Sequence, residues 1–127
     1  MRIYVGHCKD YDFVNGLYLP LRNSRLNSLH EIVLPHEKSD KPYNSKELMK
    51  SFHLMVAEVS IPATGLGIEL GWADAYGIPI LAIWKRESKL SGSVKKTAQY
   101  FLEYGNSDDM IDGIEAVISI MPRPLDS

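Results

Sequence analysis

Apolar, β-branched runs alternate along this chain with segments whose apolar residues recur every three or four positions. Short apolar runs are typical of buried strands, and the longer period is typical of amphipathic helices. The pattern predicts strands at residues 2–6, 31–35, 54–59, 78–84 and 99–104. Because helical segments separate these strands, we expect one α/β domain over residues 1–127. It should be three-layered and doubly wound, flavodoxin-like or Rossmann-like, with a five-stranded, mostly parallel sheet.

The segments between the strands predict helices at both ends of the chain. The apolar spacing between residues 13 and 29 indicates a helix that Pro20 should kink or divide, because proline has no N–H to donate. Ser45 is expected to cap a short helix at residues 46–52, and Ser107 to cap a final helix with Asp108 and Asp109 in its first turn. The final helix carries one apolar stripe: Met110, Ile111, Ile114, Val117, Ile118 and Met121.

The segment LMVAEVSIPATGLGIELGWADAYGIPILAIWKR, residues 54–86, has the pattern of a βαβ unit. Gly65, Gly67 and Gly71 flank Glu69 there, which we expect in the first turn of the helix. Glycines let backbone approach a ligand closely, and a partly desolvated carboxylate held ionised at a helix N-terminus is a good nucleophile. A glutamate at such a position is also common as a solvated residue that complements the helix dipole.

The predicted topology brings the candidate chemistry to one edge of the sheet. Ligands of open parallel sheets bind outside the carboxyl ends of the strands, where the strand order reverses. Loops at residues 6–12 and 60–67, and the segment from residue 85 onward, should share that edge. The first of these loops holds His7, Cys8 and Asp10, a dense set of reactive side chains for so short a connection.

Composition excludes several other classes of function. The net charge is −2, from 14 basic and 16 acidic residues, and there is no basic stripe for a nucleic-acid polymer. Cys8 is the single cysteine, and His30, His36 and His53 lack metal-ligand spacing, so neither a metal nor another cofactor is expected. No apolar run approaches the roughly 18 residues of a membrane span. We therefore expect a cytoplasmic protein that does not bind membranes.

Two overlapping segments resemble a known enzyme superfamily. TGLGIELGWADAYGIPILAIW, residues 64–84, resembles the active-site helix of the nucleoside 2-deoxyribosyltransferases, and MVAEVSIPATGLGIELG, residues 55–71, resembles the 2'-deoxynucleoside 5'-phosphate N-hydrolases. The Gly-x-Gly-x-Glu-x-Gly core is the specific part of this likeness. RIYVG and QYFLEY also fit the first and last strands of these enzymes.

The resemblance implies a reaction and roles for individual residues. Glu69 would attack the anomeric carbon of a nucleoside or nucleoside 5'-monophosphate, and water or a second base would resolve the glycosyl ester. Tyr4 would be a second catalytic residue that contacts the carboxylate. The residues expected to bind substrate are Gly6, His7, Asp10, His36, Thr64, Gly65 and Gly67. A homodimer or larger homo-oligomer is also implied.

Two positions differ from the pattern of the superfamily. Ser45 stands where an aspartate is usual, and Ala63 stands where the transferases have an aspartate and the hydrolases a serine. Other side chains could replace these helpers, and His7, Asp10, His36 and Glu47 are candidates.

Three further questions stay open from the sequence. The chain could be a non-catalytic module that binds a nucleotide or nucleotide sugar on the same scaffold, and a weaker alternative places phosphoryl or sulfhydryl chemistry at Cys8. Glu58, inside an apolar strand, could be a buried structural acid or could face the ligand. The environment of Glu69 distinguishes the enzyme from the binding module.

Overall fold

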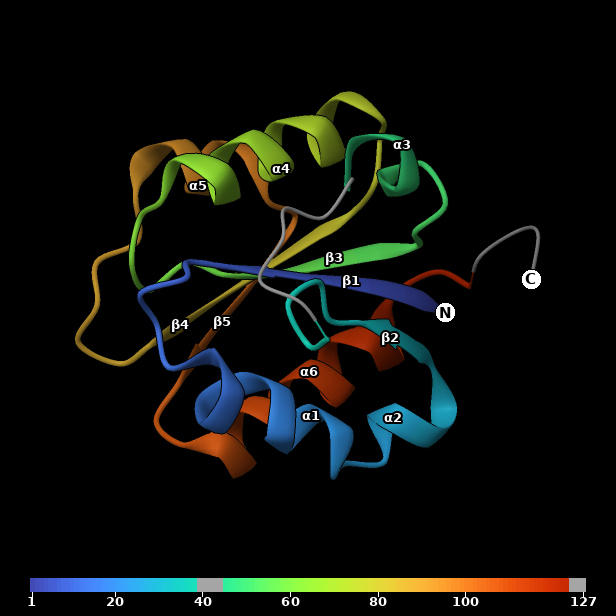
Figure 1. The fold of residues 1–127 in the computed structure, drawn as a ribbon, viewed down its shortest axis with the longest axis vertical. Coiled ribbons are helices and arrows are strands. Elements are labelled where there is room, and N and C mark those ends of the chain that lie inside the picture. Colours follow the sequence, from blue (N-terminus) through green and yellow to red (C-terminus); the bar gives the residue numbers. More distant parts are fainter. Residues whose placement is uncertain (39–44, 124–127) are drawn as a thin grey trace.

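The computed structural model describes residues 1–38 and 45–123, which form one sheet covered by helices on both faces (Figure 1). None of the described helices is long and apolar enough to cross a membrane. In chain order the elements are β1 (Arg2–His7), the π-helical turn η1 (Val14–Tyr18), α1 (Leu19–Arg22), α2 (Leu26–Leu29), β2 (Glu31–Val33), α3 (Ser45–Met49), β3 (Leu54–Glu58), α4 (Thr64–Ala75), β4 (Ile80–Lys85), α5 (Gly92–Thr97), β5 (Tyr100–Tyr104) and α6 (Ser107–Ile120).

The sheet has the strand order β2-β1-β3-β4-β5, and every neighbouring pair is parallel. This confirms the predicted flavodoxin-like α/β fold. The chain leaves β1 toward β2 and later crosses back to β3 on the other side, so the order reverses between β1 and β3. In the register of this pair, His7 lies opposite Glu58 at the carboxyl ends of both strands.

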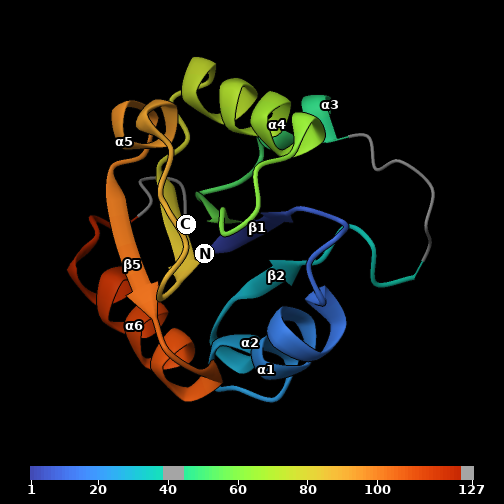
Figure 2. The ribbon, with the colours of Figure 1, turned by 90° about the vertical axis from the view of Figure 1, so that its left-hand side faces the viewer.

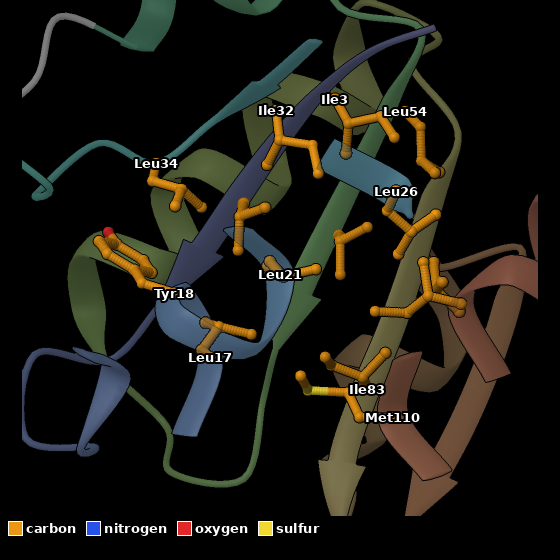
Figure 3. Packing of buried hydrophobic residues seen from close by; sticks show 14 of the residues in the cluster. Ile3, Leu17, Tyr18, Leu21, Leu26, Ile32, Leu34, Leu54, Ile83 and Met110 are labelled. Atoms are coloured by element: carbon orange, nitrogen blue, oxygen red, sulfur yellow. The ribbon is translucent and has the colours of Figure 1, made fainter. Parts of the chain in front are cut away.

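Successive residues of each strand point to opposite faces of the sheet, so the strands contribute to two separate apolar layers. On one face Tyr4, Met55 and Ala57 pack beneath α3, α4 and α5, and the other face packs against α1, α2 and α6 (Figure 2). In the second layer, strand residues such as Ile3, Ile32 and Ile83 meet Leu17, Leu21, Leu26 and Met110 from the helices (Figure 3). Burying each such side chain contributes about 1.5–3 kcal/mol, so the two layers together stabilise the packing of the helices on the sheet.

The first helical segment is divided as predicted, but the division does not lie at Pro20. The π-helical turn η1 runs directly into α1, and Pro20 sits at the start of α1, where its missing N–H is tolerated. The interruption comes at residues 23–25, before α2. Pro20 therefore coincides with a change of helix type and not with a break.

Both predicted serine caps are wrong in detail. Ser107 is the first residue of α6, and the cap is Asn106, whose side chain accepts a hydrogen bond from the Asp109 N–H at 2.9 Å. Ser45 is likewise the first residue of α3. Serine and asparagine cap helices about equally well, so residue type alone does not choose between such neighbours. The first-turn position of Asp108 is confirmed, and residues 39–44 of the predicted loop lie outside the described part of the chain.

Glu69 does not lie in the first helical turn, contrary to the prediction. Helix α4 begins at Thr64, directly after the extended Ala63, and has no acidic residue in its first turn. The glycines at 65 and 67, which suggested a loop, are helical because burial of Leu66 and Leu70 anchors this turn to the sheet. Glu69 therefore projects from the second turn of α4.

Two helical glycines provide a direct test of this packing. A Cβ added to Gly71 would meet no other atom, so Gly71→Ala should raise the free energy of unfolding by about 0.5–1 kcal/mol through helix propensity. A Cβ added to Gly113 would lie 2.5 Å from Leu102 Cδ1, so Gly113→Ala should show none of this gain. Urea denaturation of the two variants measures the difference, and equal stabilisation would contradict the packing of α6 on β5.

Candidate active site

A cavity of about 440 Å³ opens at the carboxyl ends of β1 and β3, beside the N-terminal half of α4. This is the predicted edge of the sheet, at the point where the strand order reverses. Four segments form its walls: the loop after β1, the segment after β2, the start of α3, and α4 with the residue before it. The lining residues are His7, Cys8, Lys9, Asp10, His36, Ser45, Ala63, Gly65, Leu66, Ile68, Glu69 and Trp72.

Glu69 extends from α4 into this cavity and is half-buried. Its Oε2 accepts hydrogen bonds from the Tyr4 hydroxyl and from Ser45 Oγ, the latter at 2.8 Å. Among the described residues, none donates a hydrogen bond to Oε1. One carboxylate oxygen is thus held by two neutral donors, and the other remains available to a ligand.

Gly6 makes room for this carboxylate on the surface of the sheet. A Cβ at this position would lie 3.3 Å from Glu69 Oε1 and 2.8 Å from Met55 Cε. The absence of a side chain therefore lets the carboxylate come close to β1 while it bonds to Tyr4 of the same strand. Gly6 was expected to bind substrate, and that stays a prediction; the structure shows the space that Gly6 leaves for the acid.

Burial raises the pKa of Glu69, and three neighbours oppose that shift. The hydrogen bonds from Tyr4 and Ser45 lower its pKa, and so does the nearby His36. The pKa of Tyr4 is raised by burial and by the charge of Glu69, so Tyr4 remains a neutral hydroxyl donor. On balance the pKa of Glu69 stays raised, because burial outweighs these three neighbours, which favour the ionised form only in part.

His7 is fixed in one tautomer by its neighbours. Its Nδ1 lies 3.0 Å from the Cys8 carbonyl oxygen, which can only accept, so Nδ1 carries the proton. Its Nε2 lies 2.7 Å from the Tyr18 hydroxyl, which donates to it and accepts the His36 backbone N–H at 3.0 Å. Burial lowers the pKa of His7, in keeping with a neutral ring. Both ring nitrogens of His7 are therefore already engaged.

His36 differs from His7 in this respect. Its Nδ1 is buried without a hydrogen-bond partner in the described part of the chain, and its Nε2 has none there either. Its ring meets His7 edge-on, with centroids 5.6 Å apart. Of the two histidines that line the cavity, His36 is therefore the one whose ring nitrogens are not engaged by other described residues.

The other residues expected to bind substrate are divided between the cavity and its surroundings. Asp10 and Gly65 line the cavity. Thr64 does not, and Gly67 lines a second cavity of about 250 Å³ between α4 and α5. Glu47, one of the candidate substitutes for the missing helpers, is exposed on α3 and lies outside the lining.

Several lining residues were not predicted. Ser45 was noted for its place in the chain, but its hydrogen bond to Glu69 depends on the docking of α3 against α4, which no local pattern encodes. Ile68 and Trp72 form an apolar wall four residues apart on α4, and this helical spacing could have indicated them. Glu58 lies on the opposite face of the sheet and outside the lining, which matches the structural alternative.

The described residues contain no group of three or more histidine, cysteine, aspartate or glutamate side chains that could hold a metal ion. Cys8 lines the cavity, but its thiol is buried and accepts the backbone N–H of Asp10 at 3.3 Å.

No protein-family model matches the sequence, and no curated protein matches it either. Solved structures do match: the Clostridium botulinum CMP N-glycosidase BcmB superposes with a TM-score of 0.64 at 17% sequence identity, covering 91% of this chain and 99% of that one. This chain has the fold of that N-glycosidase. A conserved protein from Enterococcus faecalis V583 also matches, with a TM-score of 0.60 at 16% identity, covering 92% of this chain and 98% of that one. The resemblance predicted from the sequence is therefore matched by a shared fold.

Gly6→Ala tests the close approach of the carboxylate to β1. The added Cβ must displace Met55 Cε and press on Glu69 Oε1, and overpacking of this kind costs about 1–3 kcal/mol. Thermal unfolding should therefore show a lower midpoint than for wild type, whereas Gly71→Ala should not lower it. A wild-type midpoint for Gly6→Ala would contradict the observed geometry.

Proposed function

We propose that this protein cleaves the N-glycosidic bond of a nucleoside or nucleoside 5'-monophosphate, with Glu69 as the nucleophile. The observation that supports this most strongly is the carboxylate of Glu69 in the cavity, with Oε2 bonded to Tyr4 and Ser45 and with no donor to Oε1 among the described residues. The fold shared with a CMP N-glycosidase favours a nucleotide substrate and makes CMP the first one to assay.

In this proposal Oε1 attacks the anomeric carbon while the bond to the base breaks. The bonding electron pair leaves with the base, the sugar passes through an oxocarbenium-like state, and a glycosyl ester forms on Glu69. Water or a second base then attacks the same carbon and releases the carboxylate. Tyr4 and Ser45 keep donating to Oε2, which is the carbonyl oxygen of the ester.

Ser45 supports the carboxylate without adding charge. A second carboxylate in contact with Glu69 would raise the pKa of the pair, whereas the Ser45 hydroxyl lowers the pKa of Glu69 by hydrogen bonding. The substitution of serine for the usual aspartate is therefore compatible with an ionised nucleophile. It leaves the protonation of the departing base to another group.

His36 is the residue we propose for contact with the departing base. Its ring lines the cavity with both nitrogens unpaired among the described residues, and it is near enough to Glu69 to affect the pKa of that carboxyl. A hydrogen bond or proton from an imidazole to a ring nitrogen or carbonyl oxygen of the base would stabilise the negative charge that develops there.

A binding module without catalysis is the second candidate. Among the described residues, no carboxylate other than Glu69 is hydrogen-bonded to Tyr4 or Ser45, and the first turn of α4 holds no acidic residue. This candidate predicts that nucleotides bind and are recovered intact.

Substitution of Glu69 separates the two candidates. Wild type, Glu69→Gln and Glu69→Ala are incubated with CMP and a panel of ribo- and deoxyribonucleosides and their 5'-monophosphates, with and without a second free base. We expect wild type to release or exchange base, and kcat/KM to fall about a thousandfold or more in either variant. Chromatography of the products measures this.

Glu103→Gln is the matched control, because Glu103 is an exposed acid on β5, remote from the cavity lining. Its activity should equal that of wild type. Base release by Glu69→Ala at the wild-type rate would exclude Glu69 as nucleophile, and intact nucleotides with every protein would favour the binding module.

The hydroxyl donors to Glu69 should set the acidic limb of the pH–rate profile. The two hydrogen bonds lower the pKa of Glu69, so removing either in Ser45→Ala or Tyr4→Phe raises it. Because the nucleophile must be ionised, activity then appears only at higher pH, and the acidic limb of kcat/KM moves upward. Ser28→Ala, an exposed serine on α2, should leave the limb unmoved, and a downward shift in Ser45→Ala would refute the assignment.

A further inference from the structure

A second buried carboxylate lies at the same edge of the sheet, on the face opposite Glu69. Glu58, at the end of β3, is 1% exposed. Its Oε1 accepts the Ser60 backbone N–H at 2.6 Å, and its Oε2 accepts the Tyr104 hydroxyl. Burying a carboxylate is costly unless its oxygens are hydrogen-bonded, and this one does not line the cavity. The chemistry proposed above leaves it without a role.

The hydrogen bonds of Glu58 continue outward to Tyr11. The Tyr104 and Tyr11 hydroxyl oxygens are 2.9 Å apart. Because the single hydroxyl proton of Tyr104 points to Glu58, Tyr11 is the donor in this contact. Its one proton also has the Gly16 carbonyl oxygen within reach at 3.3 Å, but the Tyr104 oxygen is closer, so the bonds run from Tyr11 through Tyr104 to Glu58. A Cβ on Gly16 would lie 2.8 Å from the Tyr11 hydroxyl oxygen, so the glycine leaves room for it.

Tyr11 is a residue of the loop after β1 whose side chain is buried against the sheet. It is 6% exposed, whereas the neighbouring Lys9 and Asp10 are exposed and line the cavity. The Lys85 ammonium lies 4.9 Å from the centroid of the Tyr11 ring, and the Lys85 backbone N–H donates to Ser60 Oγ at 2.8 Å. The loop is thus joined to the ends of β3, β4 and β5 through one buried cluster.

We propose that Glu58, Tyr104 and Tyr11 position the loop of residues 8–10 as the wall of the cavity that faces α4, and so set the affinity for the nucleotide. Glu58 also contacts the segment that leads to α4, the other wall of the cavity, because it accepts the Ser60 backbone N–H between β3 and α4. These are positioning residues, since none of them lines the cavity. Their effect on nucleotide affinity rests on the function proposed above, whereas their effect on the position of residues 8–10 does not.

The test uses two readouts on one variant. Tyr104→Phe removes a single hydroxyl, and Tyr100→Phe is the matched control on the same strand, because the structure gives the Tyr100 hydroxyl no hydrogen bond in its described part. Cys8 is the sole thiol of the chain, lies in the loop and is 5% exposed, so its rate of labelling by a thiol reagent reports loop opening.

For Tyr104→Phe we expect the Cys8 labelling rate and the KM for CMP each to rise at least about fivefold, while kcat stays within about twofold of wild type. Tyr11→Phe should behave alike, and the double variant should exceed neither single variant, because both hydroxyls act in one chain of bonds. Tyr100→Phe should match wild type in both readouts.

A Cys8 labelling rate in Tyr104→Phe equal to that of wild type would overturn the proposal. So would a faster rate that is fully explained by a lower free energy of unfolding, measured by urea denaturation. Faster labelling with an unchanged KM would show that the loop moves without affecting the nucleotide, which also overturns it. If wild type turns over no nucleotide, the function proposed above fails, and the labelling rates together with the dissociation constant for CMP still decide the role of the cluster.

Discussion

The hydrogen bonding of one carboxylate to one strand is the constraint on which the rest of this site depends. Glu69 must come down onto β1 to reach the Tyr4 hydroxyl, and it can do so because Gly6 has no side chain. Helix α4 is held in place for this by Leu66 and Leu70 in the apolar layer above the sheet. The core packing that holds α4 therefore also sets the position of the Glu69 carboxylate.

The edge of the sheet carries two buried or half-buried acids with opposite surroundings. Glu69 bonds to Tyr4 and Ser45 through one oxygen, and within residues 1–38 and 45–123 its other oxygen receives no hydrogen bond. Glu58 has both oxygens engaged, by Ser60 and Tyr104, on the far face of the sheet. The sheet separates them, because Glu69 projects from α4 on one face while the Glu58 side chain lies on the other, so one acid can serve chemistry while the other organises the loops.

The fold was predictable because its signals are local or periodic. The apolar runs marked all five strands, and their alternation with helical segments fixed the parallel topology and the edge where a ligand would bind. The position of Glu69 at this edge was predictable from its glycine surroundings. Its place in the second turn was not, since burial of Leu66 overrode the usual preference of glycine for loops. The contacts of Ser45 and Tyr11 join segments distant in sequence, so no local pattern encodes them.

The central claim is that a sugar becomes covalently attached to Glu69, and its most direct test is to trap that ester. Wild-type protein mixed with the nucleotide it turns over is quenched in acid within the first turnovers, digested and mapped by mass spectrometry. The account predicts a peptide containing Glu69 that carries the mass of the sugar phosphate, absent from Glu69→Gln. Turnover with no adduct on any peptide, or an adduct on a peptide without Glu69, would contradict it.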